Sequence, residues 1–351
     1  MSSLLNSPLF WGVTIFMAVL AYLMGRRSNR ADGPSGNTTS TKQASAPPVR
    51  MPPPTPPAGP SQRGRPALGS VKSWGYQLQD LDIARAAASP FDLLVIDYTK
   101  DGSDETRLTS AEIERMKRKP DGNRRIVLAY VSIGEAESYR PYWDATWKKQ
   151  RPEWLLRENP EWKENYAVCF WHPGWQDLMC GRPDAYLDRI QRQGFDGLYL
   201  DKCDVFEDLE RHEKKAAATR PDIQRDMVAF VASISGHLKA RDPNFLIVMQ
   251  NAESLIEHTD LLAAIDGVAK EELIYGIDAA EKKNAADEIA YSKACLDRAK
   301  ASGKAVFVVE YLNARDKTAQ AVKQIRDWGF VVYIAPKDRD LKRLNYDVLE
   351  A

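Results

Sequence analysis

The segment GFDGLYLDKCD, residues 194–204, carries the clearest chemical signal in this sequence. A short apolar run ends abruptly at Asp201, and a second acid, Asp204, follows three residues later. In parallel β/α barrels, the catalytic groups lie at the carboxyl ends of the strands. An acid at the end of a buried strand therefore makes an enzyme the leading interpretation.

Acidic and amide side chains recur at the ends of the other expected strands. A single acid on a loop is usually only solvated, but a set repeated at the same end of successive strands indicates a shared site. Two carboxylates are the minimum for glycoside hydrolysis, because one protonates the leaving oxygen while the other attacks or activates water. Burial near other acids would raise the pKa of one of them and keep it protonated. The recurring residues are Asp97, Glu135, Glu137, Gln250, Asn251, Glu271 and Glu310.

The motifs of several other chemistries do not occur in the sequence. It contains no GxSxG elbow, no GxxxxGK[ST] loop and no HExxH helix. The four histidines lack ligand spacing and no CxxC pair exists, so we expect no metal and no cofactor. Cys169 and Cys180 are close enough in sequence to form a disulfide in an oxidising compartment. Two free buried thiols are an equally good interpretation.

Charge is distributed unevenly along a chain whose formal net charge is zero. Residues 1–70 contain seven basic side chains and one acid, which leaves residues 71–351 with 42 basic and 48 acidic side chains. A mildly acidic domain is not typical of a nucleic-acid binder. It would suit a cationic substrate better.

The chain opens with an apolar segment that we interpret as a membrane anchor, residues 1–30. Residues 8–25 are uncharged and just long enough to span a bilayer, and neither a basic leader nor a clear cleavage site is present. We therefore expect a membrane-anchored, extracytoplasmic catalytic domain, periplasmic or at the cell surface. It would be secreted if the segment is a cleaved signal peptide. Arg26, Arg27 and Arg30 conflict with this topology, because the positive-inside rule would keep the following chain in the cytoplasm.

A proline-rich segment, residues 31–70, reads as a disordered linker. Nine of the twenty residues from 47 to 66 are proline, and such a chain favours extended polyproline II rather than a packed core. At roughly 3 Å per residue it would hold a domain up to about 100 Å from a membrane.

Residues 71–351 alternate apolar runs with helical patterns, which predicts an α/β fold of the (β/α)8 TIM-barrel class. A doubly wound sheet is the alternative, but it would want a glycine-rich turn after the first strand, where WGYQLQD offers none. The expected strands are 73–78, 93–98, 126–132, 197–201, 245–250, 267–270, 305–311 and 330–335. The expected helices are 110–118, 183–192, 223–239, 285–301 and 318–328.

Aromatic residues are concentrated in residues 139–177, which hold six of the nine tryptophans. This stretch follows the third strand, so we expect it over the barrel mouth. Its rings either fill a small local core or provide stacking platforms for sugar rings. We expect most to be structural, with Trp171 and Tyr139 the best candidates for lining a cleft.

Eight blocks resemble, in order, one known family. They are SWGYQLQD (73–80), DLLVIDY (92–98), LAYVSIGEAESYR (128–140), NPEWKENYAVCFWHPGW (159–175), GFDGLYLDKCD (194–204), VMQNAE (248–253), VAKEELIYG (268–276) and VFVVEYL (306–312). The resemblance is to the family 114 glycoside hydrolases, endo-α-1,4-polygalactosaminidases and their bacterial TIM-barrel relatives. It implies hydrolysis of an α-1,4-linked galactosamine-containing polysaccharide by a retaining enzyme.

The resemblance also implies roles for individual residues. Asp201 is expected as the nucleophile and Glu271 as the general acid/base, with the adjacent Glu272 as the alternative to Glu271. Their carboxyl groups should then lie about 5–5.5 Å apart. The expected substrate-binding shell, whose acidity suits the ammonium group of an amino sugar, comprises Asp97, Tyr130, Glu135, Glu137, Trp171, Asp204, Asn251, Glu310 and Tyr311.

Two other functions stay open at this stage. One is a barrel that binds polysaccharide without cutting it, and the other is a hydrolase of a different amino-sugar glycan, such as peptidoglycan or an exopolysaccharide of the host. In each case we expect a monomer whose partner is a polysaccharide, with the membrane as a second partner through the N-terminal helix.

Overall fold

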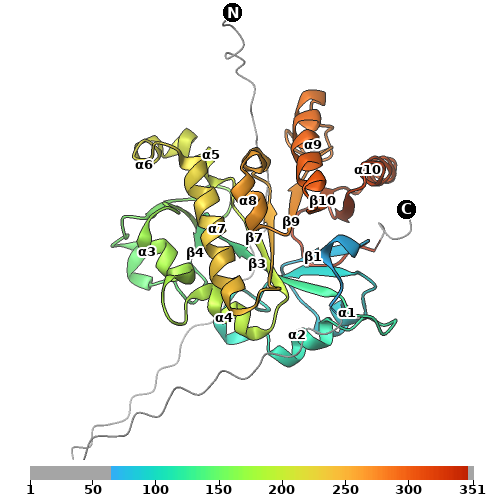
Figure 1. Cartoon of the computed structure of the whole chain (residues 1–351), viewed down its shortest axis with the longest axis horizontal. Coiled ribbons are helices and arrows are strands. Elements are labelled where there is room, and N and C mark those ends of the chain that lie inside the picture. Colours follow the sequence, from blue (N-terminus) through green and yellow to red (C-terminus); the bar gives the residue numbers. More distant parts are fainter. Residues whose placement is uncertain (1–64, 347–351) are drawn as a thin grey trace, which may run out of the picture.

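The computed structural model describes residues 65–346 (Figure 1). The expected membrane anchor, residues 1–30, and residues 31–64 of the expected linker lie outside this range. Within residues 65–346, no helix combines the length and the apolar composition that crossing a membrane requires.

Eight parallel strands form the central sheet, and their order along the chain is also their order in space. Each lies within two residues of an expected strand, so the prediction of eight short strands is confirmed. Nearly all of their residues are buried, as expected for parallel strands that are covered on both faces. The strands are β1 (Trp74–Gln77), β2 (Leu93–Ile96), β3 (Ile126–Ser132), β7 (Gly197–Asp201), β8 (Leu246–Gln250), β9 (Gly267–Glu271), β10 (Ala305–Tyr311) and β11 (Val331–Ala335).

The sheet curls into a barrel, because its first and last strands meet. The Trp74 indole N–H on β1 donates a hydrogen bond to the Val331 carbonyl on β11, at 3.0 Å. The Trp74 ring also lies 6.2 Å from that of Tyr199 on β7 and 5.6 Å from that of Phe307 on β10. Contacts among strands so far apart in the sheet order require a closed interior, which confirms the barrel-like α/β class.

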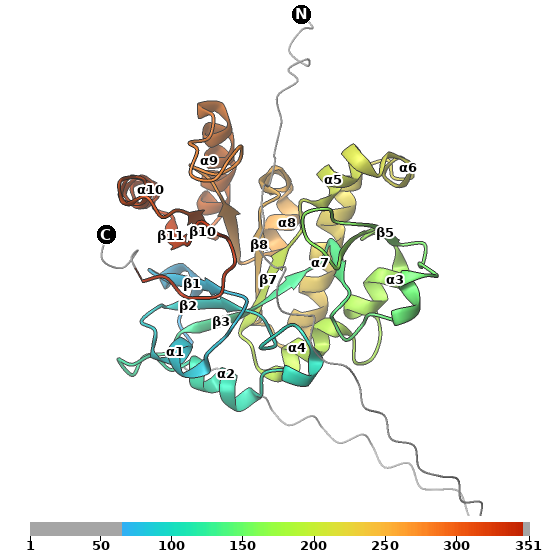
Figure 2. The same cartoon turned by 180° about the vertical axis from the view of Figure 1, so that it is seen from behind.

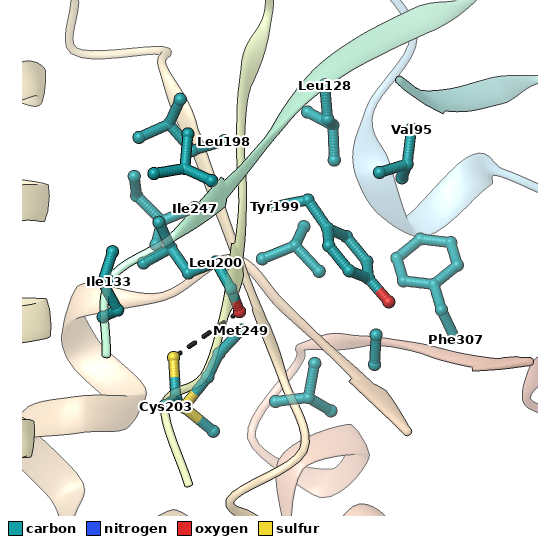
Figure 3. Close-up of a cluster of buried hydrophobic side chains, with 14 of the residues drawn as sticks. Val95, Leu128, Ile133, Leu198, Tyr199, Leu200, Cys203, Ile247, Met249 and Phe307 are labelled. Carbon is teal, nitrogen blue, oxygen red and sulfur yellow. Dashed lines mark hydrogen bonds between the residues drawn. The ribbon is translucent and has the colours of Figure 1, made fainter. Parts of the chain in front are cut away.

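The core is built from apolar side chains on both faces of the strands. Figure 3 shows part of it, where Leu128, Tyr199 and Met249 come from β3, β7 and β8. Cys203 follows β7 and is completely buried, and its thiol donates to the Leu200 carbonyl. All four cysteines are free and buried, so Cys169 and Cys180 are thiols rather than a disulfide.

Helices surround the strands on the outside of the barrel (Figures 1 and 2). All five expected helices are present with small changes at their ends. The helices are α1 (Ile83–Ala88), α2 (Ser110–Met116), α3 (Pro173–Gln176), α4 (Tyr186–Gln193), α5 (Val205–His212), α6 (Lys214–Ala217), α7 (Ile223–Arg241), α8 (Thr259–Ala264), α9 (Ala286–Ala301) and α10 (Arg315–Asp327). Short turns of other helix types are η1 (Leu68–Ser70), η2 (Asp104–Thr106), η3 (Ala145–Lys148), η4 (Asp177–Gly181) and η5 (Glu253–Glu257).

The connection between β3 and β7 carries a small antiparallel sheet, in the order β4 (Glu135–Glu137), β6 (Asn165–Val168), β5 (Leu155–Glu158). Beside it, Trp143, Trp147, Trp154 and Trp175 form a chain of ring contacts with centroids 5.0–5.3 Å apart. These tryptophans therefore fill a local core, which is the structural role that we expected for most of the aromatic stretch.

Segments at both ends of the described range pack on the barrel. The Arg65 guanidinium donates to the Asp196 carbonyl just before β7, and Leu68 is buried near Gly267 at the start of β9. Residues 65–70, which we assigned to the linker, thus cover the amino ends of the strands. At the carboxyl ends, the chain after β11 accepts hydrogen bonds from Leu78 and Gln79 at the Leu341 carbonyl.

Candidate active site

Asp201 and Glu271 lie together at the carboxyl end of the barrel and share one hydrogen-bond donor. The Gln250 side-chain amide nitrogen donates to Asp201 Oδ1 at 2.9 Å and to Glu271 Oε2 at 2.8 Å. These two oxygens are therefore no farther apart than the sum of those two distances. That limit fits the roughly 5–5.5 Å between carboxyls of retaining glycosidases and lies below the roughly 6.5–9.5 Å of inverting ones.

The alternation of side chains along the strands explains this meeting. Tyr199 points into the barrel, so Asp201, two residues further along β7, points the same way. Glu271 ends β9, two strands away in the sheet, and Gln250 ends β8 between them. Three consecutive strands thus place one polar group each at the same rim.

Tyrosine hydroxyls complete the hydrogen bonding of both carboxylates. Tyr130 donates to Asp201 Oδ2 at 2.5 Å, and the Lys202 backbone N–H donates to Oδ1 at 2.7 Å. Tyr311 donates to Glu271 Oε1, and the Asn251 amide donates to Oε2 at 3.3 Å. Both carboxylates are therefore held in fixed orientations before any substrate arrives.

Burial and mutual repulsion raise the pKa values of the pair. Burial is the main cause for Asp201, and the charge of Glu271 adds to it, so that the pKa of Asp201 is raised to about 7. Burial also raises the pKa of Glu271, with a further contribution from Glu272. Ionising one carboxyl disfavours ionising the other, so the close approach of the two acids favours protonation of the pair.

Left-handed backbone conformations follow each of the three strands. Lys202 after β7, Asn251 after β8 and Glu272 after β9 have φ values of 60°, 55° and 55°. Such conformations cost on the order of 1–3 kcal/mol for residues other than glycine, and they cluster at functional sites. Here they turn the chain sharply, so that the last side chain of each strand stays at the barrel axis.

Lys202 links the pair to Glu135 on β4. Its ammonium lies 3.4 Å from the Glu135 carboxylate, which also accepts a hydrogen bond from the Asn159 amide at 2.8 Å. Although burial disfavours the charge on Lys202, the neighbouring carboxylates Glu135, Asp204 and Asp201 raise its pKa. Asp204 lies at the start of α5, and its charge contributes to raising the pKa values of both Asp201 and Glu271.

Asp97 and Glu137 belong to a separate, buried ion network centred on Arg140. The guanidinium binds both carboxylate oxygens of Asp97, at 3.0 and 2.7 Å, and its Nε donates to Glu137 at 2.7 Å. The Arg140 side chain is 1% exposed. This network ties the end of β2 to β4, and substrate contact by either carboxylate stays a prediction.

Glu310 and Tyr311 are adjacent on β10 and therefore point to opposite faces. Tyr311 points to the axis and reaches Glu271, whereas Glu310 is completely buried and accepts from the backbone N–H groups of Ile274 and Tyr275. Burial raises the pKa of Glu310 to about 8. In this structure Glu310 fixes the loop after β9, and its expected contact with substrate stays a prediction.

The aromatic candidates differ in exposure. Trp171 is half-buried and packs edge-on against Phe170, with ring centroids 5.0 Å apart. Tyr139 as a residue is 37% exposed, the Arg140 guanidinium lies over its ring, and its hydroxyl donates to Glu137. Of the two, Tyr139 offers the more accessible face for a sugar ring.

One residue that was expected at the rim, Gln250, and two that were not, Lys202 and Arg140, hold the site together. Gln250 joins the two carboxylates, Lys202 supplies the nearest cation, and Arg140 neutralises two of the predicted shell residues. Gln250 was expected at the rim as the polar residue that ends the apolar run LIVMQ. Arg140 was not expected in the site; one of its partners, Glu137, is three positions away and the other, Asp97, is 43 positions away.

Comparisons with known proteins show the family to which the chain belongs. Residues 53–348 match glycoside-hydrolase family GH114. An uncharacterized protein of Methanocaldococcus jannaschii is 41% identical over 283 residues, which is 78% of each chain. An uncharacterized protein of Deinococcus radiodurans is 36% identical over 312 residues, covering 87% of this chain and 94% of its own length.

Among solved structures, the glycoside hydrolase domain of PelA from Pseudomonas aeruginosa has a similar fold. The match covers 78% of this chain and 97% of that domain, with a TM-score of 0.58 and 18% sequence identity. The family match spans all of the described residues, including both carboxylates of the pair. The chain therefore belongs to glycoside-hydrolase family GH114.

Proposed function

We propose that this protein is a retaining glycoside hydrolase that cleaves an α-1,4-linked galactosamine-containing polysaccharide. The observation that carries the proposal is the Gln250 amide shared by Asp201 and Glu271. One bridging amide holds the two carboxyls at a spacing that fits the direct attack of a retaining enzyme better than the water-mediated attack of an inverting one.

In the proposed reaction, Asp201 attacks the anomeric carbon while Glu271 donates its proton to the departing oxygen. A glycosyl ester on Asp201 results, and the leaving sugar carries away the proton. Glu271, now ionised, removes a proton from water, which attacks the same carbon and releases Asp201. The pair carries the same net charge before and after the reaction, because Glu271 gives one proton to the leaving oxygen and then takes one from water.

The neighbouring charges support this division of roles. Burial and the charge of Glu271 raise the pKa of Asp201 and Lys202 opposes this rise, whereas burial and the charge of Glu272 raise the pKa of Glu271. The Tyr130 hydroxyl and the Lys202 N–H hydrogen-bond the Asp201 carboxylate. We assign Asp201 as the nucleophile because a cation, Lys202, lies beside it, and Glu271 as the acid because a second carboxylate, Glu272, lies beside it.

The acidic surroundings support a cationic sugar. Asp204, Glu135 and Glu207 accompany the pair, and the cations among them are Lys202 and Lys270. An ammonium group at the sugar C2 position would be attracted to such a site. N-acetylation would remove that charge, so the free amine is the preferred form.

Polymer cleavage by matched variants tests the proposal. Asp201→Asn and Glu271→Gln should each lower turnover of α-1,4-polygalactosamine by roughly 10²–10⁴-fold or more, with unchanged folding. Glu161→Gln, an exposed acid on the β3–β7 connection, is the control and should retain full activity. Early products should keep the α configuration by NMR. Full activity of both variants would exclude the roles, and tight binding without new reducing ends would identify a binding barrel.

We also propose that residues 1–30 anchor the barrel at the outer side of a membrane, with residues 31–64 as the spacer. The uncharged segment at residues 8–25 supports an anchor. A reporter that is active in only one compartment, fused after residue 351, tests the orientation. A cytoplasmic signal would show that Arg26, Arg27 and Arg30 determine the topology instead.

A further inference from the structure

The segment after β11 brings an arginine close to the general acid from a distant part of the chain. Arg339 donates a hydrogen bond to the Glu272 carboxylate and another to the Gly276 carbonyl, at 3.3 Å. Its guanidinium also lies 5.6 Å from the centroid of the Tyr311 ring. Glu272 is the residue after Glu271, and Tyr311 is the residue whose hydroxyl binds Glu271.

The Arg339–Glu272 ion pair is largely removed from solvent. The exposed fractions of the two side chains are 8% and 10%. Removing one partner of a buried ion pair is costly, because the charge of the other partner then lies in a region of low dielectric constant. Because the pair lies next to Glu271, such a charge would act directly on that carboxyl.

The local backbone is shaped to form this pair. Glu272 and Arg339 both have left-handed conformations, with φ values of 55° and 58°. Gly276 has a φ of 119°, and a Cβ at that position would overlap the Glu272 carboxylate. Three strained or side-chain-free positions, on two separate loops, are therefore needed to bring Arg339 and Glu272 together.

We propose that Arg339 is a positioning residue, which compensates the charge of Glu272 beside the general acid and supports the ring of Tyr311. The proposal rests on the function given above for Glu271. A cation stacked on the face of Tyr311 fixes the ring, and the fixed ring directs the hydroxyl at Glu271. The loop after the last strand thus takes part in catalysis without contacting the reacting atoms.

Other charged and titratable groups also face Glu271, and the experiment holds them constant. From the neighbouring elements these are Asp201, Asp204, Tyr76, Tyr199 and Tyr311, and from β9 and the residue after it they are Lys270 and Glu272. None of them is altered in the variants below except Glu272. A change in the titration of Glu271 is therefore attributable to the Arg339–Glu272 pair.

The decisive variant is Glu272→Gln in the full-length chain. It removes the carboxylate that pairs with Arg339 beside Glu271, and since arginine does not deprotonate in proteins, the pKa of Glu271 should fall by about half a unit or more. The double variant Glu272→Gln/Arg339→Gln removes both charges and should restore the wild-type value. Lys337→Gln, which breaks the Lys337–Glu281 pair of the same two loops, is the control and should cause no shift.

Two readouts separate this proposal from the function on which it rests. The first is ¹³C NMR titration of glutamate carboxyls, with the Glu271 signal assigned from its absence in Glu271→Gln, and it requires no turnover. The second is the basic limb of the pH profile of kcat/KM, which should move in the same direction. If the wild type hydrolyses nothing, the proposed function fails, while the NMR titration still decides the role of the ion pair.

The support of Tyr311 has its own test. Arg339→Gln should lower kcat by at least about tenfold with little change in KM, and Arg339→Lys should recover part of that loss because it keeps the charge. A titration of Glu271 in Glu272→Gln that stays within about 0.2 pH unit of wild type would overturn the charge role. Equal KM and kcat effects in Arg339→Gln, without recovery by lysine, would overturn the positioning role.

Discussion

Replacing Asp201 by asparagine should stabilise the protein while abolishing its activity. The pKa of Asp201 in the folded state is raised to about 7, from an ordinary value of 3.8, first by burial and then by the charge of Glu271. Between these two pH values the folded state binds a proton that the unfolded state does not. Stability therefore falls as pH rises from about 4 to about 7, and asparagine removes this loss.

The size of the effect follows from the same values. Each pKa unit corresponds to about 1.36 kcal/mol, so ionising Asp201 in the folded state costs on the order of 4 kcal/mol above pH 7. Asparagine also preserves the hydrogen bonds. Its carbonyl oxygen can accept from the Lys202 backbone N–H and the Gln250 amide, which both donate to Oδ1 in the wild type. Its side-chain NH2 group can donate to the Tyr130 hydroxyl, which donates to Oδ2 in the wild type.

Thermal unfolding from pH 4 to pH 9 measures this prediction. For a domain of this size, about 4 kcal/mol corresponds to a rise in Tm of roughly 6–8 °C at pH 8, shrinking to nothing near pH 4. Asp92→Asn is the matched control of opposite sign. Burial opposes the charge of Asp92, but hydrogen bonds from Lys119 and the backbone outweigh it and lower its pKa. That variant should lose stability at neutral pH and progressively less toward acid.

The result that would refute the reasoning is a lower Tm for Asp201→Asn than for wild type at pH 8. A gain that is the same at every pH would be equally damaging, because it would show that packing rather than ionisation is responsible. Either outcome would mean that ionising Asp201 in the folded protein does not cost the free energy inferred from its raised pKa.

Three further variants address the surroundings of the site. Arg140→Met should lower the free energy of unfolding by about 3–5 kcal/mol in chemical denaturation, because it leaves two buried carboxylates unpaired, whereas Arg124→Met, at a partly exposed pair, should cost about 1 kcal/mol or less. Gln250→Met should lower kcat/KM by at least about 10²-fold, through loss of two hydrogen bonds to carboxylates of about 1.5–3 kcal/mol each, and unchanged steady-state kinetics would contradict this. Gly276→Ala should lower Tm and weaken the Glu272 ion pair, and a crystal structure with an unmoved Glu272 carboxylate would count against it.

Strand positions were predictable from the sequence because the signal is local. Runs such as LLVI and IVLAYVS are apolar on both faces, which is typical of a parallel strand covered on both sides. The helices that were missed, α1, α3, α5, α6 and α8, have four to eight residues and give few turns in which a 3.6-residue period can show, although α2 and α4, of similar length, were predicted. The start of α1 depends on one residue, Asp82, whose carboxylate accepts from two backbone N–H groups.

The candidate site was predictable to the extent that it follows from strand ends. Asp201, Glu271 and Asn251 could be expected together because the carboxyl ends of parallel strands meet at one rim. The alternation of side chains would also have separated Glu310 from Tyr311, had it been applied to β10. The Arg140–Asp97 and Arg339–Glu272 pairs were beyond prediction, since folding brings their partners together from 43 and 67 positions apart.

Burial is the single physical cause behind both the chemistry and the instability of this site. The rings of Trp74, Tyr76 and Tyr199 fill the barrel below the carboxylates, with centroids 5.3–6.2 Å apart. These rings exclude water, so the two carboxyls cannot both ionise at neutral pH without a large cost. The cost is tolerated because Tyr130, Gln250 and the backbone donate hydrogen bonds that hold the charge in place. A more polar interior would lower the cost of ionising Asp201 and Glu271 and so stabilise the protein at this rim. It would also make both carboxyls ionise at neutral pH, and the proposed reaction needs one of them protonated.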